Sequence, residues 1–398
     1  MMKILYLASE FHWCGASISF LNLLKGLKSK DVEMLVVVPN TAPVSVEFVN
    51  KLFDMGIRYF QIPLPWEVEY QCGFKDRLKK KTKNLIKYIL HRSNPYLIQK
   101  DKSKQVLKAL IKEYHPDIVH TNVGVFHEGF EVCQELGIPH VWHLRDYHDL
   151  DFHWMPLPSW KVYKQQLKQS DAVITITNDI KKHYGLWDSP NAYTIYNGCF
   201  DAGDVAMDFP KENYFFSASR IVEAKGHDDT VRAFDMFYQN HKDFKLVLAG
   251  IGENHYIDHL KELISRLSCR DAVELIGHQQ DVRPWMCKAK ALVVASYNEG
   301  FGRMTAEAAF CGCLVIGRNT GGTKEILDQI GGFSFENEDA INGIYKRMED
   351  VVNLSEKQYL TMAERAQNKA VSLYSNESYV EKVYTVYKKL MGDSVCRL

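Results

Sequence analysis

Short apolar runs alternate along the chain with segments of helical spacing. Between the first two runs, Ile18, Leu21, Leu24 and Leu27 recur at helical intervals, and the segment 44–56 predicts a second helix that stops at a glycine. Strands that alternate with helices in this way predict parallel sheets with helices on both faces. In the first half of the chain, the apolar runs that predict strands are 2–9, 34–40, 57–63, 117–122, 140–146, 172–177 and 192–198.

The alternation stops after Gly198 and then begins again. The segment 199–213 has no periodicity and contains glycine, proline and several acids, so we predict a linker there. Strands follow at 213–220, 245–252, 273–277, 291–296 and 314–317, with helices near 226–240 and 255–267. The predicted organisation is therefore a Rossmann-like domain over 1–198, a linker over 199–213, a second such domain over 214–376, and an amphipathic C-terminal helix within 377–398.

Composition agrees with a soluble protein of two domains. The chain has 398 residues, of which 46% are hydrophobic and 25% charged, and its formal net charge is +0. No run approaches the ~20 apolar residues of a membrane-spanning helix, and we interpret the start, MMKILYLASEF, as a strand and not a signal peptide. Nine scattered cysteines without a C-x-x-C motif indicate reduced thiols in a cytosolic protein and no zinc site.

The richest chemistry follows the predicted strand at 291–296. A loop with Gly300 and Gly302 opens there into TAEAAF, a good helix-forming segment. Backbone N–H groups and the positive end of a helix suit an anion, and Glu299 and Glu307 bracket the loop with carboxylates that can accept hydrogen bonds from sugar hydroxyls. A nucleotide sugar has both kinds of group. An isolated pair of acids at this spacing is more often a plain turn and a solvated helix residue.

The longer stretch 295–327 changes that judgement. It combines Glu299 and Glu307 around EGFG, a small-residue helix, Gly312, the strand LVIG, and the turn Gly321-Gly322-Thr323-Lys324-Glu325. This order resembles the signature of retaining glycosyltransferases of family 4. The resemblance implies an α/β protein of the GT-B fold, with two doubly wound Rossmann-like domains facing across a cleft and a last helix that packs back on the first domain.

The resemblance also implies which residues bind the donor. SASRIVEAKG carries Arg220 and Lys225, which match the family's R-x4-K pair and would neutralise a diphosphate, although a loop Arg/Lys pair is usually just solvated. We expect Glu299, Arg220, Lys225 and His143 to be the catalytic residues. The donor would also contact Glu307 and the loop formed by Gly300, Phe301, Gly302, Arg303, Met304 and Thr305.

Two features of the first domain match the family less closely. Gly15, Ala16 and Ser17 stand where the family has a glycine loop toward the donor, but Cys14 precedes Gly15, so a plain turn with Ser17 as helix N-cap is nearly as good an explanation. His143 ends a strand, where the family places a histidine near the transferred sugar. Nearby, Arg145 and Asp146 suit either acceptor binding or mutual pairing.

The implied reaction is sugar transfer with retention from a nucleotide diphosphate, UDP or a similar one, to a hydroxyl of a glycan or lipid-linked acceptor. No protein nucleophile, metal or cofactor is required. The acids at 149–151 are a weak metal signal, and LAGIGENH lacks the third glycine of a nicotinamide site. Two alternatives stay open, a nucleotide-sugar epimerase of the same fold and an inactive carbohydrate-binding protein, although the intact Arg220, Lys225, Glu299 and Glu307 argue against inactivity.

A basic segment stands out in this neutral protein. Lys75 to Lys104 contains eleven Lys or Arg against two Asp, interleaved with apolar residues. A solvated amphipathic helix and a surface for anionic lipid explain it equally well, whereas a nucleic-acid partner is disfavoured. We expect a cytoplasmic protein, with peripheral attachment to the inner face of the cell membrane if the lipid interpretation holds.

Overall fold

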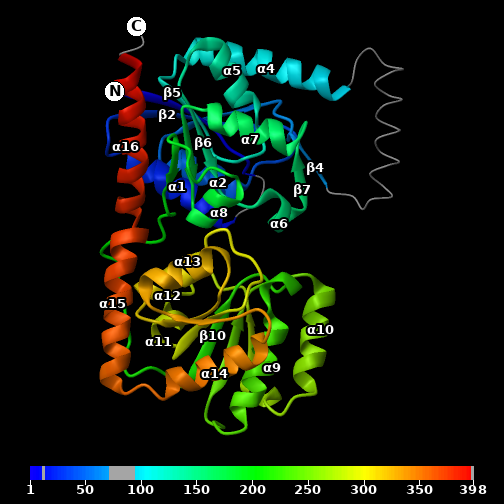
Figure 1. Cartoon of the computed structure of the whole chain (residues 1–398), viewed down its shortest axis with the longest axis vertical. Coiled ribbons are helices and arrows are strands. Elements are labelled where there is room, and N and C mark those ends of the chain that lie inside the picture. Colours follow the sequence, from blue (N-terminus) through cyan, green and yellow to red (C-terminus); the bar gives the residue numbers. More distant parts are fainter. Residues whose placement is uncertain (11–13, 71–94, 396–398) are drawn as a thin grey trace. The chain divides into compact units, whose positions relative to one another are not determined.

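A computed structural model describes residues 1–10, 14–70 and 95–395 of the chain (Figure 1). It divides into two compact units, which are described separately. The first contains Met1–Ile195 together with Val380–Leu398, and the second contains Tyr196–Tyr379. The segment 199–213 counts within the second unit, where Cys199 and Lys211 are buried.

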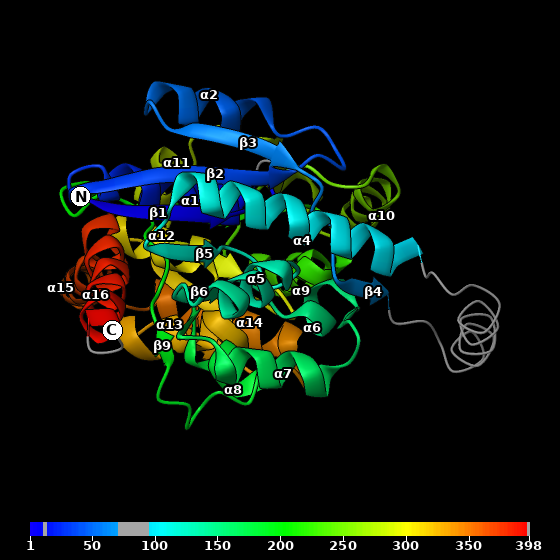
Figure 2. The ribbon, with the colours of Figure 1, turned by 90° about the horizontal axis from the view of Figure 1, so that it is seen from above.

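The first unit is built on a seven-stranded parallel sheet in the order β3-β2-β1-β5-β6-β8-β9 (Figure 2). The strands are β1 (Met2–Leu7), β2 (Val32–Pro39), β3 (Arg58–Ile62), β5 (Ile118–Thr121), β6 (His140–Leu144), β8 (Ala172–Thr175) and β9 (Ala192–Thr194). The helices are α1 (Gly15–Leu27), α2 (Val46–Asp54), α4 (Pro95–Tyr114), α5 (Glu128–Leu136), α6 (His148–Phe152), α7 (Trp160–Gln169) and α8 (Asn178–His183). Every residue of β5, β6 and β8 is buried, as expected for strands covered on both faces.

The C-terminal helix α16 (Asn376–Val395) belongs to the first unit from Val380 onward. A Cβ added at Gly26 of α1 would lie 2.4 Å from a methyl carbon of Val380, so the two helices meet closely. Helical spacing predicts one apolar face on this helix, made of Tyr379, Val383, Val386 and Leu390, and all four residues are buried. Amphipathic spacing therefore described the buried side of this helix.

The second unit repeats the plan with a six-stranded parallel sheet in the order β12-β11-β10-β13-β14-β15. Its strands are β10 (Tyr214–Ala218), β11 (Lys245–Ala249), β12 (Val273–Gly277), β13 (Ala291–Val294), β14 (Leu314–Arg318) and β15 (Phe333–Phe335). Its helices are α9 (His227–Tyr238), α10 (Asn254–Ser265), α11 (Arg283–Lys288), α12 (Arg303–Phe310), α13 (Gly321–Ile330), α14 (Ala340–Val352) and α15 (Glu356–Tyr374). The α/β prediction of two parallel-sheet, Rossmann-like units is confirmed.

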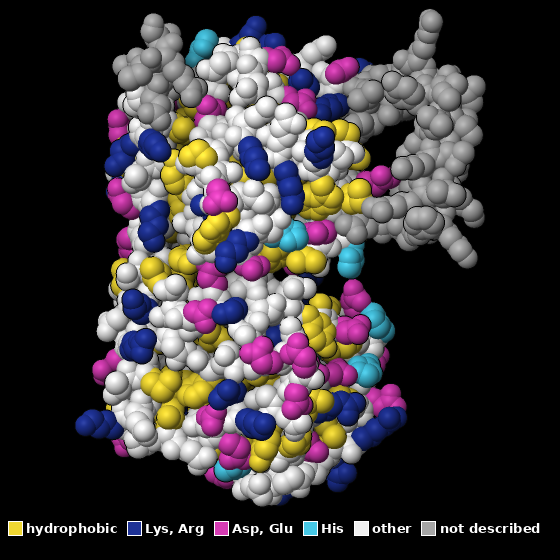
Figure 3. Space-filling model, viewed as in Figure 1, with side chains coloured by type: hydrophobic (Ala, Val, Ile, Leu, Met, Phe, Trp, Pro, Cys, Tyr) yellow, Lys and Arg dark blue, Asp and Glu magenta, His cyan; other side chains and the backbone are white. Residues whose placement is uncertain are grey.

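Some elements escaped the sequence patterns. A short antiparallel pair joins β4 (Val68–Tyr70) to β7 (Trp154–Pro156), and the short helix α6 precedes β7. On the face shown in Figure 3, basic and acidic side chains are interspersed, as the net charge suggests. No helix of the described ranges is both long enough and apolar enough to cross a membrane.

Candidate functional site

The motifs of the second unit meet where its strand order reverses. β10 and β13 are neighbours in the sheet, although two strands and three α-helices separate them in the chain. Ligands of open parallel sheets bind at such a reversal, beyond the carboxyl ends of the strands. The loop after β10 carries Arg220 and Lys225, and the loop after β13 carries Glu299. The sheet thus places the two predicted motifs side by side.

Lys225 and Glu299 form a direct ion pair. The Lys225 ammonium lies 2.6 Å from Oε1 of Glu299, and the two side chains are 17% and 22% exposed. Because the pair is partly shielded from water, it is stronger than a fully solvated one. Arg220, on the same loop, is exposed and makes no ion pair with any other residue of the described ranges. The structure therefore joins Lys225 to Glu299 and leaves the Arg220 guanidinium toward solvent.

Gly226 allows the two loops to approach this closely. Its φ is +67°, and a Cβ at this position would lie 2.2 Å from the carbonyl oxygen of Ala295. The backbone N–H of Tyr297 also donates to the carbonyl of Ala224, at 3.0 Å. Any side chain at residue 226 would push the loops apart, so this glycine helps to set the geometry of the Lys225–Glu299 pair.

The helix after the EGFG loop includes the predicted segment TAEAAF but begins two residues earlier, at Arg303. Gly302, with φ +85°, caps α12, and the first turn carries Arg303. Nε of Arg303 donates to Oε1 of Glu307 at 3.0 Å, and a second guanidinium nitrogen donates to the same oxygen at 2.5 Å. Glu307 is only 4% exposed. Glu307 is therefore not a solvated helix residue.

The double-glycine turn supports the loop from the other side. The N–H of Gly322 donates to the carbonyl of Glu299 at 2.8 Å, and a Cβ at Gly322 would lie 2.3 Å from the carbonyl oxygen of Phe301. The side chains of Phe301 and Thr305 are buried. From Phe301, then, a ligand would meet backbone atoms and not the aromatic ring.

In the first unit, the loop before α1 ends one residue before Gly15 and not at Ser17. α1 begins at Gly15 with Cys14 as its N-cap, so the interpretation of Ser17 as N-cap is wrong. Ser17 lies in the first turn, is 1% exposed and hydrogen-bonds Glu10. Burial raises the pKa of Glu10 to about 7, although the Ser17 bond and the Arg145 charge oppose the shift.

His143 lies inside the first unit. It is fully buried, and its Nδ1 is 3.3 Å from Nε2 of His120, whose other ring nitrogen is 2.6 Å from the hydroxyl of Tyr387 on α16. Burial, together with the positive charge of Arg145, holds the pKa of His143 well below its usual range. The ring is therefore neutral at physiological pH.

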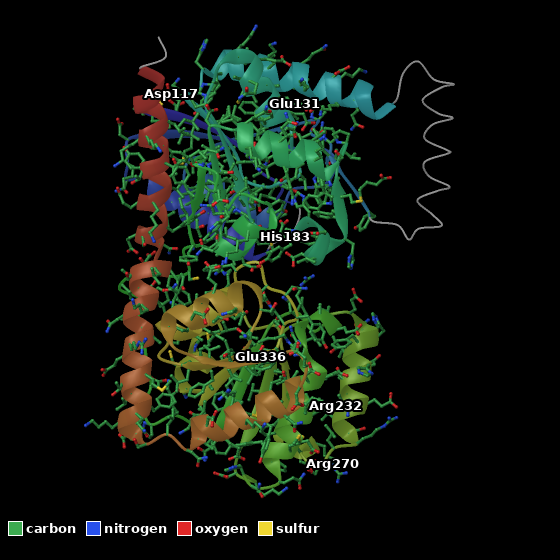
Figure 4. All side chains as sticks on the ribbon, viewed as in Figure 1. Asp117, Glu131, His183, Arg232, Arg270 and Glu336 are labelled. Atoms are coloured by element: carbon green, nitrogen blue, oxygen red, sulfur yellow. The ribbon has the colours of Figure 1, made fainter. Side chains whose placement is uncertain are left out.

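Polar side chains at the ends of β5 and β6 bond one another. Arg145 donates from Nε and a terminal nitrogen to Oδ1 of Asn122, at 2.9 and 2.7 Å. The acids at 149–151 have local partners, since Asp149 lies 2.8 Å from His183 (labelled in Figure 4) and Asp151 accepts from the N–H of Tyr147 at 2.9 Å. Within the ranges that the structure describes, no group of three or more His, Cys, Asp or Glu side chains is placed to hold a metal ion.

Most of the basic segment, 71–94, lies outside the described residues. Three of its later lysines are described. Lys102 is exposed, and the other two are paired. Lys100 lies 2.7 Å from Glu67 and 2.6 Å from Glu131 of α5, and Lys104 contacts Glu131 and Glu135 (Figure 4 labels Glu131). These two charges hold α4 to α5 within the domain.

Two residues beside the candidate site were missed. Arg318, at the end of β14, is buried and donates from Nε to the Ala295 carbonyl at 3.0 Å and from a terminal nitrogen to Asp229 at 2.6 Å. Thr323 is buried beneath the EGFG loop. A charged residue at the end of the apolar run LVIG was a usable signal for Arg318. Thr323 was named above only as part of the double-glycine turn, and no pattern assigned a role to its hydroxyl.

Comparison with known proteins agrees with this geometry. The family described as glycosyl transferases group 1 matches residues 206–369, and glycosyltransferase family 4 matches residues 13–199. An uncharacterised 42.6 kDa protein in the cps region of Klebsiella pneumoniae is 27% identical over 54% of this chain and 61% of its own length. A diphospho-undecaprenol N-acetylgalactosaminyltransferase of Campylobacter jejuni is 30% identical over 28% of this chain and 29% of its own length. The match thus spans less than two thirds of either relative.

Solved structures agree on the fold. HepE from Anabaena, in complex with UDP and glucose, superimposes with a TM-score of 0.73 at 18% identity, covering 98% of this chain and 100% of that one. At this identity, the likeness shows the fold alone. The two family matches together span most of the sequence, one for each sheet-bearing half. The chain therefore belongs to the group 1, family 4 glycosyltransferases of the GT-B fold.

Proposed function

We propose that this protein transfers a sugar, with retention, from a UDP-sugar to a hydroxyl of a glycan or lipid-linked acceptor in the synthesis of cell-surface polysaccharide. The observation that carries the proposal is the Lys225–Glu299 ion pair, held at the strand reversal beside the start of α12. A cation, a carboxylate and a helix N-terminus together suit a ligand that has both phosphate and hydroxyl groups.

Each donor-side residue has a distinct role in this proposal. Lys225, with Arg220, neutralises the diphosphate as it leaves and gains charge. Glu299 keeps the Lys225 ammonium in place before the donor arrives. The buried side chain of Glu307 accepts hydrogen bonds from ribose hydroxyls, and its bond to Arg303 keeps it oriented. Backbone N–H groups of residues 300–304 face the phosphates, whereas the N–H of Thr305 already donates to the carbonyl of Gly302 at 3.0 Å.

The retaining mechanism assigns few chemical steps to the protein. The donor sugar leaves as an oxocarbenium-like species, the acceptor hydroxyl attacks from the same face, and the departing phosphate takes the proton. Positioning and electrostatics carry the rate. Because His143 is buried and neutral, we assign it a hydrogen-bonding role and not proton transfer. The proposed reaction needs no metal or cofactor, so a chelator should leave turnover unchanged.

The relatives support the substrate classes. HepE was solved with UDP and glucose, the Campylobacter enzyme's name specifies a diphospho-undecaprenol acceptor, and the Klebsiella protein lies in a cps region. A lipid-linked acceptor would require the protein to work at the inner face of the cell membrane. In that case the basic residues of 71–94 would supply the attachment, because Lys100 and Lys104 are already paired.

Calorimetry with UDP tests the donor assignment. Glu307→Gln keeps the shape of the side chain but removes its charge, so we expect UDP affinity to fall by ~1–3 kcal/mol, about 5- to 150-fold. Glu274→Gln is the matched control, because Glu274 lies on the edge strand β12, away from the strand reversal, and pairs with Lys245 of β11.

Two results would contradict the proposal. Absence of UDP binding by the wild type would remove the donor assignment. Rapid epimerisation or hydrolysis of the UDP-sugar with no acceptor present would favour the epimerase or a hydrolase over a transferase. A panel of nucleotide sugars in a thermal-shift assay would then identify the preferred donor, since the tightest ligand raises the Tm most.

A further inference from the structure

Two buried threonine hydroxyls beside the candidate donor site lack partners. Thr305 of α12 is 0% exposed and Thr323 of α13 is 1% exposed. Neither Oγ1 atom has a hydrogen-bond partner among the described residues. Folded proteins satisfy the large majority of buried polar groups, because an unmatched hydroxyl loses its bonds to water and gains none in return. Two such groups in one place therefore require an explanation.

Both hydroxyl oxygens lie near the same point. A Cβ built on Gly302 would lie 3.1 Å from Oγ1 of Thr323 and 3.4 Å from Oγ1 of Thr305, with the backbone nitrogen of Thr323 also at 3.4 Å. Two hydroxyls and an amide nitrogen thus gather beside the side-chain-free surface of a glycine. The methyl group of Thr323 lies against Gly317 on its other side, 2.7 Å from where a Cβ of that glycine would be.

The surroundings of this point favour an anion. Gly302 is the N-cap of α12, and Thr323 is the third residue of α13, so the first turns of two helices meet there. Helix N-termini carry partial positive charge and orphan N–H donors. The N–H of Gly322 donates to the Glu299 carbonyl at 2.8 Å, so the loop that carries Glu299 adjoins this point. The side chain of Glu299 in turn pairs with Lys225.

We propose that Thr305 and Thr323 form a hydroxyl pair that binds a phosphate oxygen of the nucleoside diphosphate. Each Oγ–H donates to the oxygen, which accepts both bonds. The identity of the ligand rests on the proposed function, whereas the presence of an oxyanion site rests on the hydroxyls themselves. In the ligand-free protein the hydroxyls are unsatisfied, and binding satisfies them.

Thr→Val variants separate this proposal from a structural role. Valine keeps the branched shape and removes only the hydroxyl. For Thr305→Val and Thr323→Val we expect two effects of opposite sign: the ligand-free Tm rises, because an unsatisfied polar atom is gone, and UDP affinity falls by about tenfold or more for each. Affinity for uridine, which has no phosphate, should stay at the wild-type value.

Thr121→Val is the matched control. Thr121 is equally buried, but its Oγ1 lies 2.8 Å from Nε2 of His140 in the first unit. Removing a satisfied hydroxyl should lower the Tm and leave UDP affinity unchanged. The same chemical substitution is thus expected to raise the Tm at Thr305 or Thr323 and to lower it at Thr121.

Two results would overturn the hydroxyl pair. One is unchanged UDP and pyrophosphate affinity in the double Thr305→Val/Thr323→Val variant. The other is a Tm that falls in both single variants, which would mean that the hydroxyls bind something internal, such as a buried water. If the wild type fails to bind UDP but binds inorganic pyrophosphate, and the double variant does not, the proposed donor is refuted while the oxyanion site stands.

Discussion

Gly322 offers a sharp test of how the double-glycine turn supports the donor loop. A methyl group at this position would lie 2.3 Å from the oxygen and 2.5 Å from the carbon of the Phe301 carbonyl, both backbone atoms. Ordinary contact begins at 3.4 Å, so Gly322→Ala forces α13 or the loop to move by about 1 Å. Overpacking of this kind costs ~1–3 kcal/mol. Loss of the Gly322–Glu299 hydrogen bond adds about 1 kcal/mol.

Gly331 at the other end of the same helix is the matched control. Its φ is +81°, but the nearest atom to an added Cβ is 3.8 Å away. Gly331→Ala therefore adds backbone strain of roughly 1–2 kcal/mol without a clash. The smaller entropy of the unfolded chain offsets ~0.4–1 kcal/mol of that. The expected net loss is about 1 kcal/mol, against ~2–4 kcal/mol for Gly322→Ala.

The assay combines thermal unfolding with UDP calorimetry. Gly322→Ala should lower the Tm more than Gly331→Ala and should weaken UDP binding by about tenfold or more, since displacement of the loop separates Glu299 from Lys225. Gly331→Ala should bind UDP as the wild type does. The reasoning is refuted if the two variants lose equal stability, or if Gly322→Ala keeps full UDP affinity.

Three further predictions concern charge. Lys225→Gln should lower kcat more than donor affinity, because charge on the leaving phosphate peaks in the transition state; a raised KM with normal kcat would restrict Lys225 to binding. Burial raises the pKa of Glu128 from its ordinary 4.5 to about 9, and the negative charge of the neighbouring Glu67 adds to the shift. The folded protein therefore holds a proton that the unfolded chain releases between these pH values, so the free energy of unfolding falls as pH rises from 4.5 to 9. Glu128→Gln should therefore raise stability on the order of 3 kcal/mol at pH 7 and flatten the dependence of Tm on pH between 5 and 8; an unaltered profile would place the titration elsewhere. If the basic segment attaches the protein to anionic lipid, co-sedimentation with anionic vesicles should weaken as salt is added. Changing four lysines to glutamine (Lys79, Lys80, Lys81 and Lys83) should weaken the binding free energy by on the order of 1 kcal/mol per charge removed. Equal binding of the variant and the wild type would contradict the idea.

Local pattern alone located most of the sheets and the motifs. Apolar runs such as 34–40 and 291–296 became β2 and β13, because parallel strands buried on both faces are apolar along their length. The glycine loop became the start of α12 because Gly302 adopts a positive φ that other residues avoid. The antiparallel pair of β4 and β7 was not predicted, because each strand has only three residues and does not lie in a longer β-rich run, as β9 does.

Tertiary structure decided which of these residues act together. Lys225 and Glu299 are 74 positions apart, and only the reversal between β10 and β13 brings them to 2.6 Å. Burial was also decided by packing, which made Glu307 a buried, Arg-bonded carboxylate and made His143 a neutral core residue. Thr323 shows the same limit most clearly. Its hydroxyl is ordinary in the sequence and becomes significant only because two helix starts meet at Gly302 and leave it without a partner.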